Sequence, residues 1–220
     1  MKTIVITSQK GGSGKTTLAA HLAVEAERVG DKPTWLIDTD KQGTLSLWHE
    51  RRESGTPQRA DAPFARLAEG LKVLRDQGAA FCLIDTPPTI SEQSATVLEL
   101  ADLVLIPVRP SPADLWAVSE TVSLVKEADK PFLFVITQAK AQASITAQSI
   151  AALSQHGRVA QAFIADRVPY AVAMTGGRTA PELGAKSAAA EEISALWRDV
   201  KSIFQEKFKP AKQLRSVAHG

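Results

Sequence analysis

The chain has 220 residues, of which 44% are hydrophobic and 23% are charged, a balance that is typical of one globular domain and excludes wholesale disorder. Its 26 basic and 24 acidic residues leave a net charge of +2, so a nucleic-acid surface would have to come from local clustering of charge. The single cysteine excludes a disulfide framework or a multi-cysteine metal site within one chain.

Short apolar segments alternate with amphipathic ones along the chain, which predicts an α/β fold with a mostly parallel sheet of about seven strands and helices on both faces. The expected strands are 3–7, 33–37, 80–84, 103–107, 132–136 and 159–164. The expected helices are 16–29, 64–76, 91–100, 112–128, 145–155 and 187–208. Ser111 and Asp114 flank Pro112 and give the helix at 112–128 a clear start signal.

The helix expected at 187–208 carries an apolar stripe with helical spacing, which is typical of a face packed on a core. The stripe comprises Ile193, Leu196, Trp197, Val200, Phe204 and Phe208. An amphipathic membrane-binding helix is the alternative interpretation. We expect one domain over residues 1–209 and a flexible basic tail over 210–220. No run of about 18 apolar residues and no cleavable leader is present, which indicates a cytoplasmic protein.

Residues 9–17 read Gln-Lys-Gly-Gly-Ser-Gly-Lys-Thr-Thr and lie between an expected strand and an expected helix, the context of a phosphate-binding loop. The glycines allow backbone N–H groups to approach phosphate oxygens, and the start of the following helix attracts the same anion. Lys15 can reach the β- and γ-phosphates, and the Thr16 hydroxyl can ligate Mg²⁺. The predicted phosphate contacts are Gly11, Gly12, Ser13, Gly14, Lys15, Thr16 and Thr17.

The usual phosphate loop begins with glycine where this chain has Gln9, and a second lysine, Lys10, follows. This form resembles the deviant Walker A motif of the ParA/MinD class of P-loop ATPases, and the resemblance extends over residues 2–208. It implies that ATP and Mg²⁺ are the cofactors and that ATP favours a homodimer. In such a dimer Lys10 would reach across the interface to the partner's nucleotide.

Aspartates end two of the expected strands, at Asp38 and Asp85, and Asp40 follows shortly after the first. The carboxyl ends of parallel strands form the ligand-binding edge of an open sheet, although one strand-end aspartate is also typical of a turn or a cap. By resemblance, Asp85 is the Walker B aspartate that holds Mg²⁺ with Thr16. Asp40 would orient the attacking water, and Asp38 would support the metal or Lys15. Lys41 stands where the family usually has proline.

Three later segments also resemble the family, at 105–115, 134–138 and 166–170. The resemblance places Thr137 beside the adenine base and the loop of Arg167 and Pro169 around it. The ring of Tyr170 could stack on adenine, or it could belong to the core or the surface.

The resemblance implies an ATPase that partitions DNA: an ATP-bound dimer binds DNA without sequence preference and is released when a small centromere-binding adaptor stimulates hydrolysis. Lys186, Arg198 and Lys201 are the candidate DNA contacts, with Lys207 and Lys209 nearby. An ordinary solvated helix face is the alternative for these residues. A nucleoid-associated state would accompany ATP binding.

Other members of this fold suggest other functions. A MinD-like membrane ATPase needs a terminal amphipathic anchor, which residues 203–208 would provide only weakly. A biosynthetic enzyme would need a substrate-carboxylate site that the sequence does not display. An iron-protein reductase would need two cysteines per chain, whereas Cys82 lies inside an expected strand. A ParA-like ATPase that positions a protein cargo would use the same residues as a DNA partition ATPase.

Overall fold

The computed structural model describes residues 1–88, 92–140 and 144–206. These residues form a sheet of six strands in the order β3-β2-β4-β1-β5-β6, and every pair of neighbouring strands is parallel. The predicted α/β class is therefore confirmed, with a sheet that is entirely parallel within the described residues.

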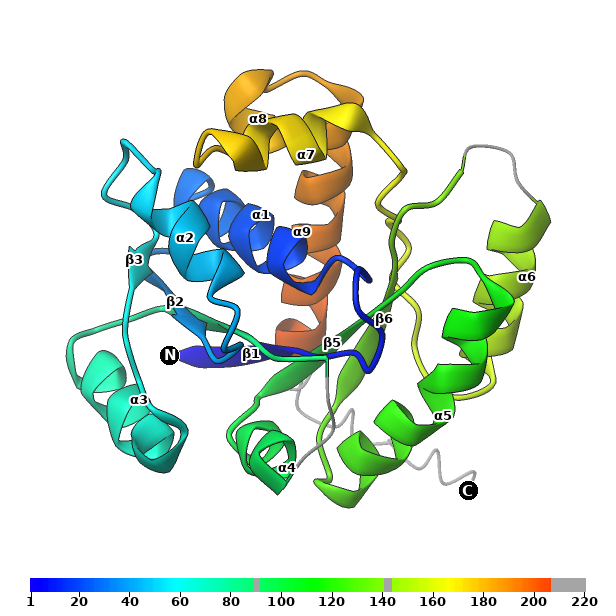
Figure 1. Cartoon of the computed structure of the whole chain (residues 1–220), viewed down its shortest axis with the longest axis horizontal. Helices are drawn as coiled ribbons and strands as arrows, with labels where there is room; N and C mark the ends of the chain where they lie inside the picture. The colour runs from blue at the N-terminus through cyan, green and yellow to red at the C-terminus, as the bar shows by residue number, and fades with distance from the viewer. Residues whose placement is uncertain (89–91, 141–143, 207–220) are drawn as a thin grey trace, which may run out of the picture.

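The elements follow one another along the chain with helices between most strands (Figure 1). The strands are β1 (Lys2–Ile6), β2 (Thr34–Asp38), β3 (Gln58–Arg59), β4 (Phe81–Asp85), β5 (Leu103–Val108) and β6 (Phe132–Ile136). The α-helices are α1 (Lys15–Arg28), α2 (Thr44–Glu50), α3 (Leu67–Asp76), α4 (Glu92–Glu99), α5 (Pro112–Glu127), α6 (Ser144–Ser154), α7 (Val168–Thr175), α8 (Ala180–Leu183) and α9 (Ala188–Glu206), and a short 3-10 helix (Phe64–Arg66) leads into α3.

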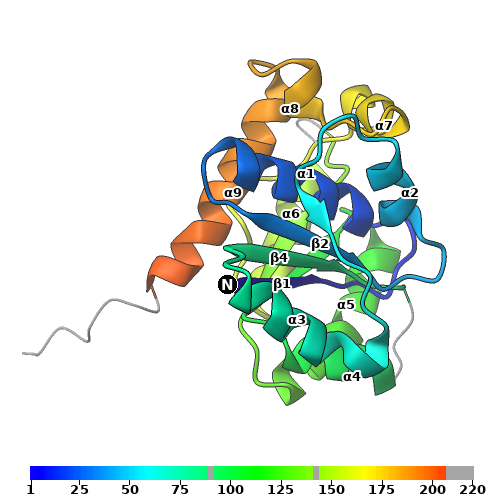
Figure 2. The ribbon, with the colours of Figure 1, turned by 90° about the vertical axis from the view of Figure 1, so that its left-hand side faces the viewer.

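Two layers of helices cover the sheet. Helices α1, α2, α7, α8 and α9 lie on one face, and α3, α4, α5 and α6 lie on the other (Figures 1 and 2). Each layer encloses its own hydrophobic cluster, one around Leu22 and Trp197 and the other around Val104 and Val122. Because both faces are covered, strand β5 is buried at every position, as expected for a strand of a parallel sheet.

The strand register aligns the residues from which the candidate site is built. Asp38 at the end of β2 pairs in register with Asp85 at the end of β4. Ile6 at the end of β1 also pairs with Asp85. Three adjacent strands therefore end at one level, and this level is the carboxyl edge of the sheet, where such sheets bind ligands.

The strand predicted at 159–164 is wrong: the segment makes only isolated bridges, between Phe134 and Val159 and between Ala139 and Ala165. The segment lies beside β6 at both of its ends. In its middle, however, the N–H of Ala162 donates to Asp199 of α9 at 2.9 Å. That tertiary hydrogen bond takes the donor that a continuous ladder would use, which explains why the apolar pattern fails to form a strand here.

Several sequence interpretations are confirmed by burial. The stripe on α9 packs in the core from Ile193 to Phe204, and burial of Ile203 and Phe204 (8% exposed each) leaves them poorly placed as a membrane anchor. Phe208 lies outside the described residues, as does the tail at 210–220. Cys82 is buried, and burial raises the pKa of its thiol to about 12. In the described part of the chain, no helix has both the length and the apolar character needed to cross a membrane.

Candidate functional site

The loop between β1 and α1 has the conformation of an anion cradle. Gly12 and Gly14 have φ angles of 72° and 93°, which residues with a Cβ atom rarely adopt. Lys15 opens α1 and is only 7% exposed, and its Nζ donates to the carbonyl of Ser8 at 3.3 Å. Burial lowers the pKa of Lys15, while Asp85 and Asp40 oppose that shift. The ammonium is thus held across the loop, near two carboxylates.

The two residues that directly follow β6 donate hydrogen bonds to the backbone of the phosphate loop. Thr137 Oγ1 donates to the carbonyl of Ser13 at 2.8 Å, and Gln138 Nε2 donates to the carbonyl of Gly12 at 2.7 Å. In a trans peptide the N–H points away from the carbonyl. Because the carbonyls of Gly12 and Ser13 face Gln138 and Thr137, the N–H groups of the same peptides face away from these two residues. Thr137, which is expected beside the adenine base, therefore also stabilises the conformation of the phosphate loop. Gln138, with φ of 51°, was not singled out from the sequence.

Thr16 and Asp85 form the polar pair expected of a magnesium site. The Thr16 hydroxyl donates to Asp85 Oδ2 at 2.6 Å, and Asp85 is 1% exposed. Its other oxygen, Oδ1, is buried without a hydrogen-bond partner in the described structure. Burial raises the pKa of Asp85 to about 7, with smaller upward contributions from Asp38 and Asp40 and opposing ones from Thr16 and Lys15.

A hydrated divalent cation would satisfy that orphan oxygen, and it would favour the ionised form of Asp85. Mg²⁺ binds proteins through one or two oxygen ligands, phosphates and water, so it needs no cage of carboxylates. Among the described residues, no group of three or more His, Cys, Asp or Glu could hold a metal. Thr16 and Asp85 therefore fit Mg²⁺.

The segment after β2 is organised by Asp38. Its Oδ1 accepts the N–H of Asp40 at 3.1 Å, and its Oδ2 accepts the N–H of Ser46, in the first turn of α2, at 2.9 Å. Asp40 in turn accepts the N–H of Gln42 at 3.0 Å. Asp38 is thus engaged with backbone, which favours a support role over direct contact with nucleotide, and Lys41 is exposed beside it.

An open pocket of about 190 Å³ begins beside the phosphate loop and extends along the segment that follows β6. Its lining includes Gly14, Thr17, Thr137, Arg167 and Tyr170. Tyr170 is 6% exposed, and its ring packs edge-on against His21 of α1, with 5.2 Å between ring centroids. The tyrosine is thus part of the core that supports the pocket.

Arg167 and Pro169 occupy the start of helix α7. Arg167 lines the pocket, and its Nε donates to Glu192 of α9 at 2.8 Å. Pro169 is exposed in the first turn of the helix. Their roles at the base remain predictions, and so does the contact of Lys10 with a partner's nucleotide.

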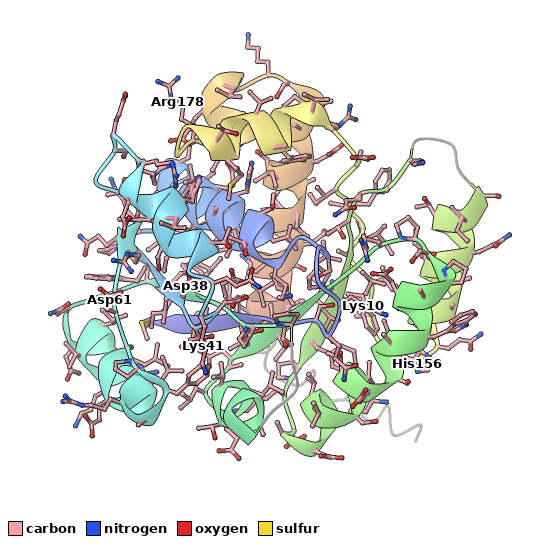
Figure 3. All side chains as sticks on the ribbon, viewed as in Figure 1. Lys10, Asp38, Lys41, Asp61, His156 and Arg178 are labelled. Carbon is pink, nitrogen blue, oxygen red and sulfur yellow. The ribbon has the colours of Figure 1, made fainter. Side chains whose placement is uncertain are left out.

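Lys10 lies on the phosphate loop, Asp38 ends β2, and Lys41 lies on the segment between β2 and α2 (Figure 3). Arg109 approaches the loop at Gly12, where a Cβ atom would lie 3.6 Å from its Nη1. Asp114 holds Arg109 through bonds of 3.0 and 3.2 Å, and Ser111 caps α5 by accepting the N–H of Asp114. The predicted helix start is confirmed, and this ion pair places the Arg109 guanidinium beside the loop.

The candidate DNA contacts differ in their surroundings. Arg198 and Lys186 are exposed. Lys201 Nζ lies 2.9 Å from Asp31 Oδ2, an oxygen that also accepts Trp197 Nε1 at 2.8 Å. Its charge is therefore partly neutralised within the protein. Lys207 and Lys209 lie outside the described residues.

A family model described as the CobQ/CobB/MinD/ParA nucleotide binding domain matches residues 4–180. The chain belongs to this family. Its members of the ParA/MinD type are P-loop ATPases, and the match includes the phosphate loop, Asp38, Asp40 and Asp85. The family resemblance read from Lys10 and Lys15 is thereby confirmed.

Individual ParA/MinD-type proteins resemble the chain over most or part of its length. Maintenance of carboxysome distribution protein A from Halothiobacillus neapolitanus is 28% identical over 211 residues, covering 90% of this chain and 95% of that protein. Protein ParA from Rhizobium radiobacter is 28% identical over 132 residues, 59% of each chain. The structure of septum site-determining protein MinD with Mg-ADP, from Pyrococcus horikoshii, superposes with a TM-score of 0.77 at 18% identity, covering 95% of this chain and 99% of that one. At that identity the likeness concerns the fold.

Proposed function

We propose that this ParA/MinD-type protein is an Mg²⁺-dependent ATPase that works as a positioning switch. ATP binding favours a nucleotide-sandwich dimer, the dimer binds DNA without sequence preference, and an adaptor protein stimulates hydrolysis and release. The observation that carries the proposal is the meeting of Lys15, Asp40 and the Thr16–Asp85 pair at one edge of the sheet.

The chemistry assigned to these residues is mainly positioning and electrostatics. Lys15 and the loop N–H groups hold the phosphates. Thr16 and Asp85 would hold Mg²⁺, which would neutralise charge on the phosphate oxygens. Asp40 orients the attacking water, and Asp38 keeps Asp40 in place through the backbone hydrogen bond at 3.1 Å. Lys10 reaches the nucleotide of the partner, so productive hydrolysis awaits the dimer.

The proposed DNA surface centres on Arg198 and Lys186, both of which are exposed. Lys201 contributes less, because its ammonium already pairs with Asp31 at 2.9 Å. Phosphate contacts by such residues make binding sensitive to salt, and DNA binding in the ATP state would associate the protein with the nucleoid.

A protein cargo is a second candidate beside DNA partition. The relative named for carboxysome distribution is matched over 95% of its length. The relative named ParA is matched over 59% of its length. The same switch would move either cargo. A small adaptor that binds a centromere would serve the first case, and an adaptor that binds the protein cargo would serve the second.

Fluorescence anisotropy of a random-sequence duplex, titrated with protein in Mg-ATP and in Mg-ADP at two salt concentrations, tests the DNA step. We expect salt-sensitive binding in Mg-ATP only, and weaker binding by Arg198→Glu with basal ATPase unchanged. Lys72→Glu, an equal charge change on α3 at the opposite face of the sheet (Figure 1), is the control and should bind as the wild type does. Absence of binding in both nucleotides, with ATPase intact, would refute DNA as the matrix and direct the search to lipid vesicles.

A further inference from the structure

One carboxylate on α9 gathers three hydrogen bonds from the segment that follows β6. Glu192 Oε2 accepts the N–H of Ala165 at 3.1 Å and the hydroxyl of Tyr170 at 2.8 Å. Its Oε1 accepts Arg167 Nε at 2.8 Å. The Glu192 side chain is 14% exposed, so these bonds replace most of the hydration of the carboxylate.

All three donors line the pocket that opens beside Gly14 and Thr17. The phosphates of a nucleotide belong at the loop N–H groups and at the start of α1. The base and ribose must then extend along the pocket toward Ala165 and Arg167, away from Lys15. The segment 165–170, held by Glu192, therefore forms the base end of the pocket.

We propose that Glu192 is a positioning residue for nucleotide binding, whose carboxylate fixes the segment 165–170 in the shape that receives the base. The inference rests on the proposed function in one respect, that the ligand of the pocket is a nucleotide. It adds a residue of α9, outside the matched region 4–180, to the nucleotide site.

The donors that face Glu192 are suited to a negative charge. The bond to Glu192 raises the pKa of Arg167. Burial, joined by the bond to Glu192, raises the pKa of Tyr170, so the phenol stays a donor at neutral pH. Charge-assisted bonds of this kind are stronger than neutral ones.

A glutamine in place of Glu192 has one acceptor oxygen and one NH₂ group. If the oxygen accepts from Ala165 and Tyr170, the NH₂ group faces the guanidinium of Arg167. In the other orientation it faces the N–H and the hydroxyl. Either orientation loses at least one of the three bonds and the charge, and the segment 165–170 loses its fixed position.

Isothermal titration calorimetry of Glu192→Gln with Mg-ADP and, separately, with magnesium pyrophosphate tests the proposal. Pyrophosphate occupies only the phosphate loop, so it reports on the site without the base. We expect the affinity of Glu192→Gln for ADP to fall about tenfold and its affinity for pyrophosphate to stay within about twofold. Glu191→Gln removes the same charge from the neighbouring, exposed position of α9 and should bind both ligands as the wild type does.

Wild-type affinity of Glu192→Gln for ADP would overturn the proposal, and so would equal losses for ADP and pyrophosphate, since those would indicate damage to the whole site. If Glu192→Gln fails to fold, Tyr170→Phe, which removes only one donor, takes its place. It should lose ADP affinity alone, by a smaller factor, and unchanged ADP binding would count against Glu192. If the wild type binds neither ligand, the nucleotide site itself is refuted. If it binds both and the variants match it, only the role of Glu192 is refuted.

Discussion

The Thr16 hydroxyl donates a 2.6 Å hydrogen bond to Asp85 Oδ2, which joins the first turn of α1 to the end of β4. The remaining oxygen of Asp85 is buried without a partner in the described structure. The pair is therefore a half-completed set of oxygen ligands, oriented by the parallel register of β1 and β4. A carboxylate in this position serves a bound cation better than it serves the stability of the fold.

Asp85→Asn tests whether this carboxylate serves cation binding at the expense of the stability of the fold. Burial raises the pKa of Asp85 to about 7 from 3.8, so the folded protein binds a proton more tightly than the unfolded chain, and stability falls as the pH rises from about 4 to about 7. Asparagine removes this dependence. We expect Asp85→Asn to unfold in urea at pH 8 no earlier than the wild type, while Mg²⁺-dependent ATPase activity is lost. Normal activity in this variant, or clear destabilisation at pH 8, would contradict the assignment.

Lys15→Ala should weaken nucleotide binding about 100-fold, since loss of charge-assisted bonds to phosphate costs about 2–3 kcal/mol. Titration with a fluorescent ATP analogue measures the effect, and Lys72→Ala on α3 provides the control. Hydrolysis at the wild-type rate by Lys15→Ala would show that the phosphate loop has been assigned wrongly.

Asp40→Ala separates binding from hydrolysis. Because the Asp40 side chain accepts the N–H of nearby Gln42 and holds no distant element in place among the described residues, its removal should leave ATP affinity within a few-fold. Turnover should fall about 100-fold or more, the usual cost of losing a group that orients or activates a nucleophile. Steady-state ATPase assays and equilibrium binding measure the two effects, with Asp76→Ala on α3 as the control. Turnover that survives the substitution would move the water-orienting role to another residue.

Burial of His21 should make the stability of the fold depend on pH. It is buried in α1, where its Nδ1 pairs with the carbonyl of Thr17 at 2.8 Å and its Nε2 accepts the N–H of Ala180 at 3.0 Å. Burial lowers its pKa to about 4 from 6.5. The unfolded chain therefore takes up this proton first as the pH falls, and His21 destabilises the fold progressively from about pH 6.5 to about pH 4, by at most about 3 kcal/mol.

Urea unfolding of wild type and His21→Leu at pH 7.5 and pH 5 measures this contribution. We expect His21→Leu to be less stable at pH 7.5, because two hydrogen bonds are lost, but to lose less on acidification. The difference between the two proteins isolates His21 from Asp85, whose contribution has the opposite sign. His156→Leu, at an exposed position, should keep the wild-type dependence. Parallel pH dependences for wild type and His21→Leu would refute the assignment.

The sequence predicts the parts of this site that are local in the chain. Lys15 and Thr16 begin the helix that follows the glycine-rich loop, and Asp85 ends an apolar strand, so a parallel fold brings them together without further information. Short elements escaped prediction: the two residues of β3 pair only because β2 is beside them, and α2, α7 and α8 are held by tertiary contacts such as Trp48 Nε1 to the carbonyl of Arg178 at 3.0 Å.

Contacts between distant segments were the other limit. The bond from Ala162 to Asp199, which interrupts the expected strand at 159–164, joins residues that no pattern relates. The same holds for Glu192, whose partners lie more than twenty residues earlier in the chain. Gln138 could have been considered because it follows Thr137, but its role depends on a backbone conformation that the sequence does not encode by residue type alone.

The central claim is an ATP-dependent dimer that depends on Lys10. Sedimentation velocity of the wild-type chain, in Mg²⁺ with a non-hydrolysable ATP analogue and with ADP, tests it most directly. We expect the 23.6 kDa monomer with ADP and a species of twice that mass with the analogue. Lys10→Ala should remain a monomer in both, although this variant still binds nucleotide. A wild-type protein that keeps one mass in both nucleotides, or a Lys10→Ala variant that dimerises normally, would contradict it.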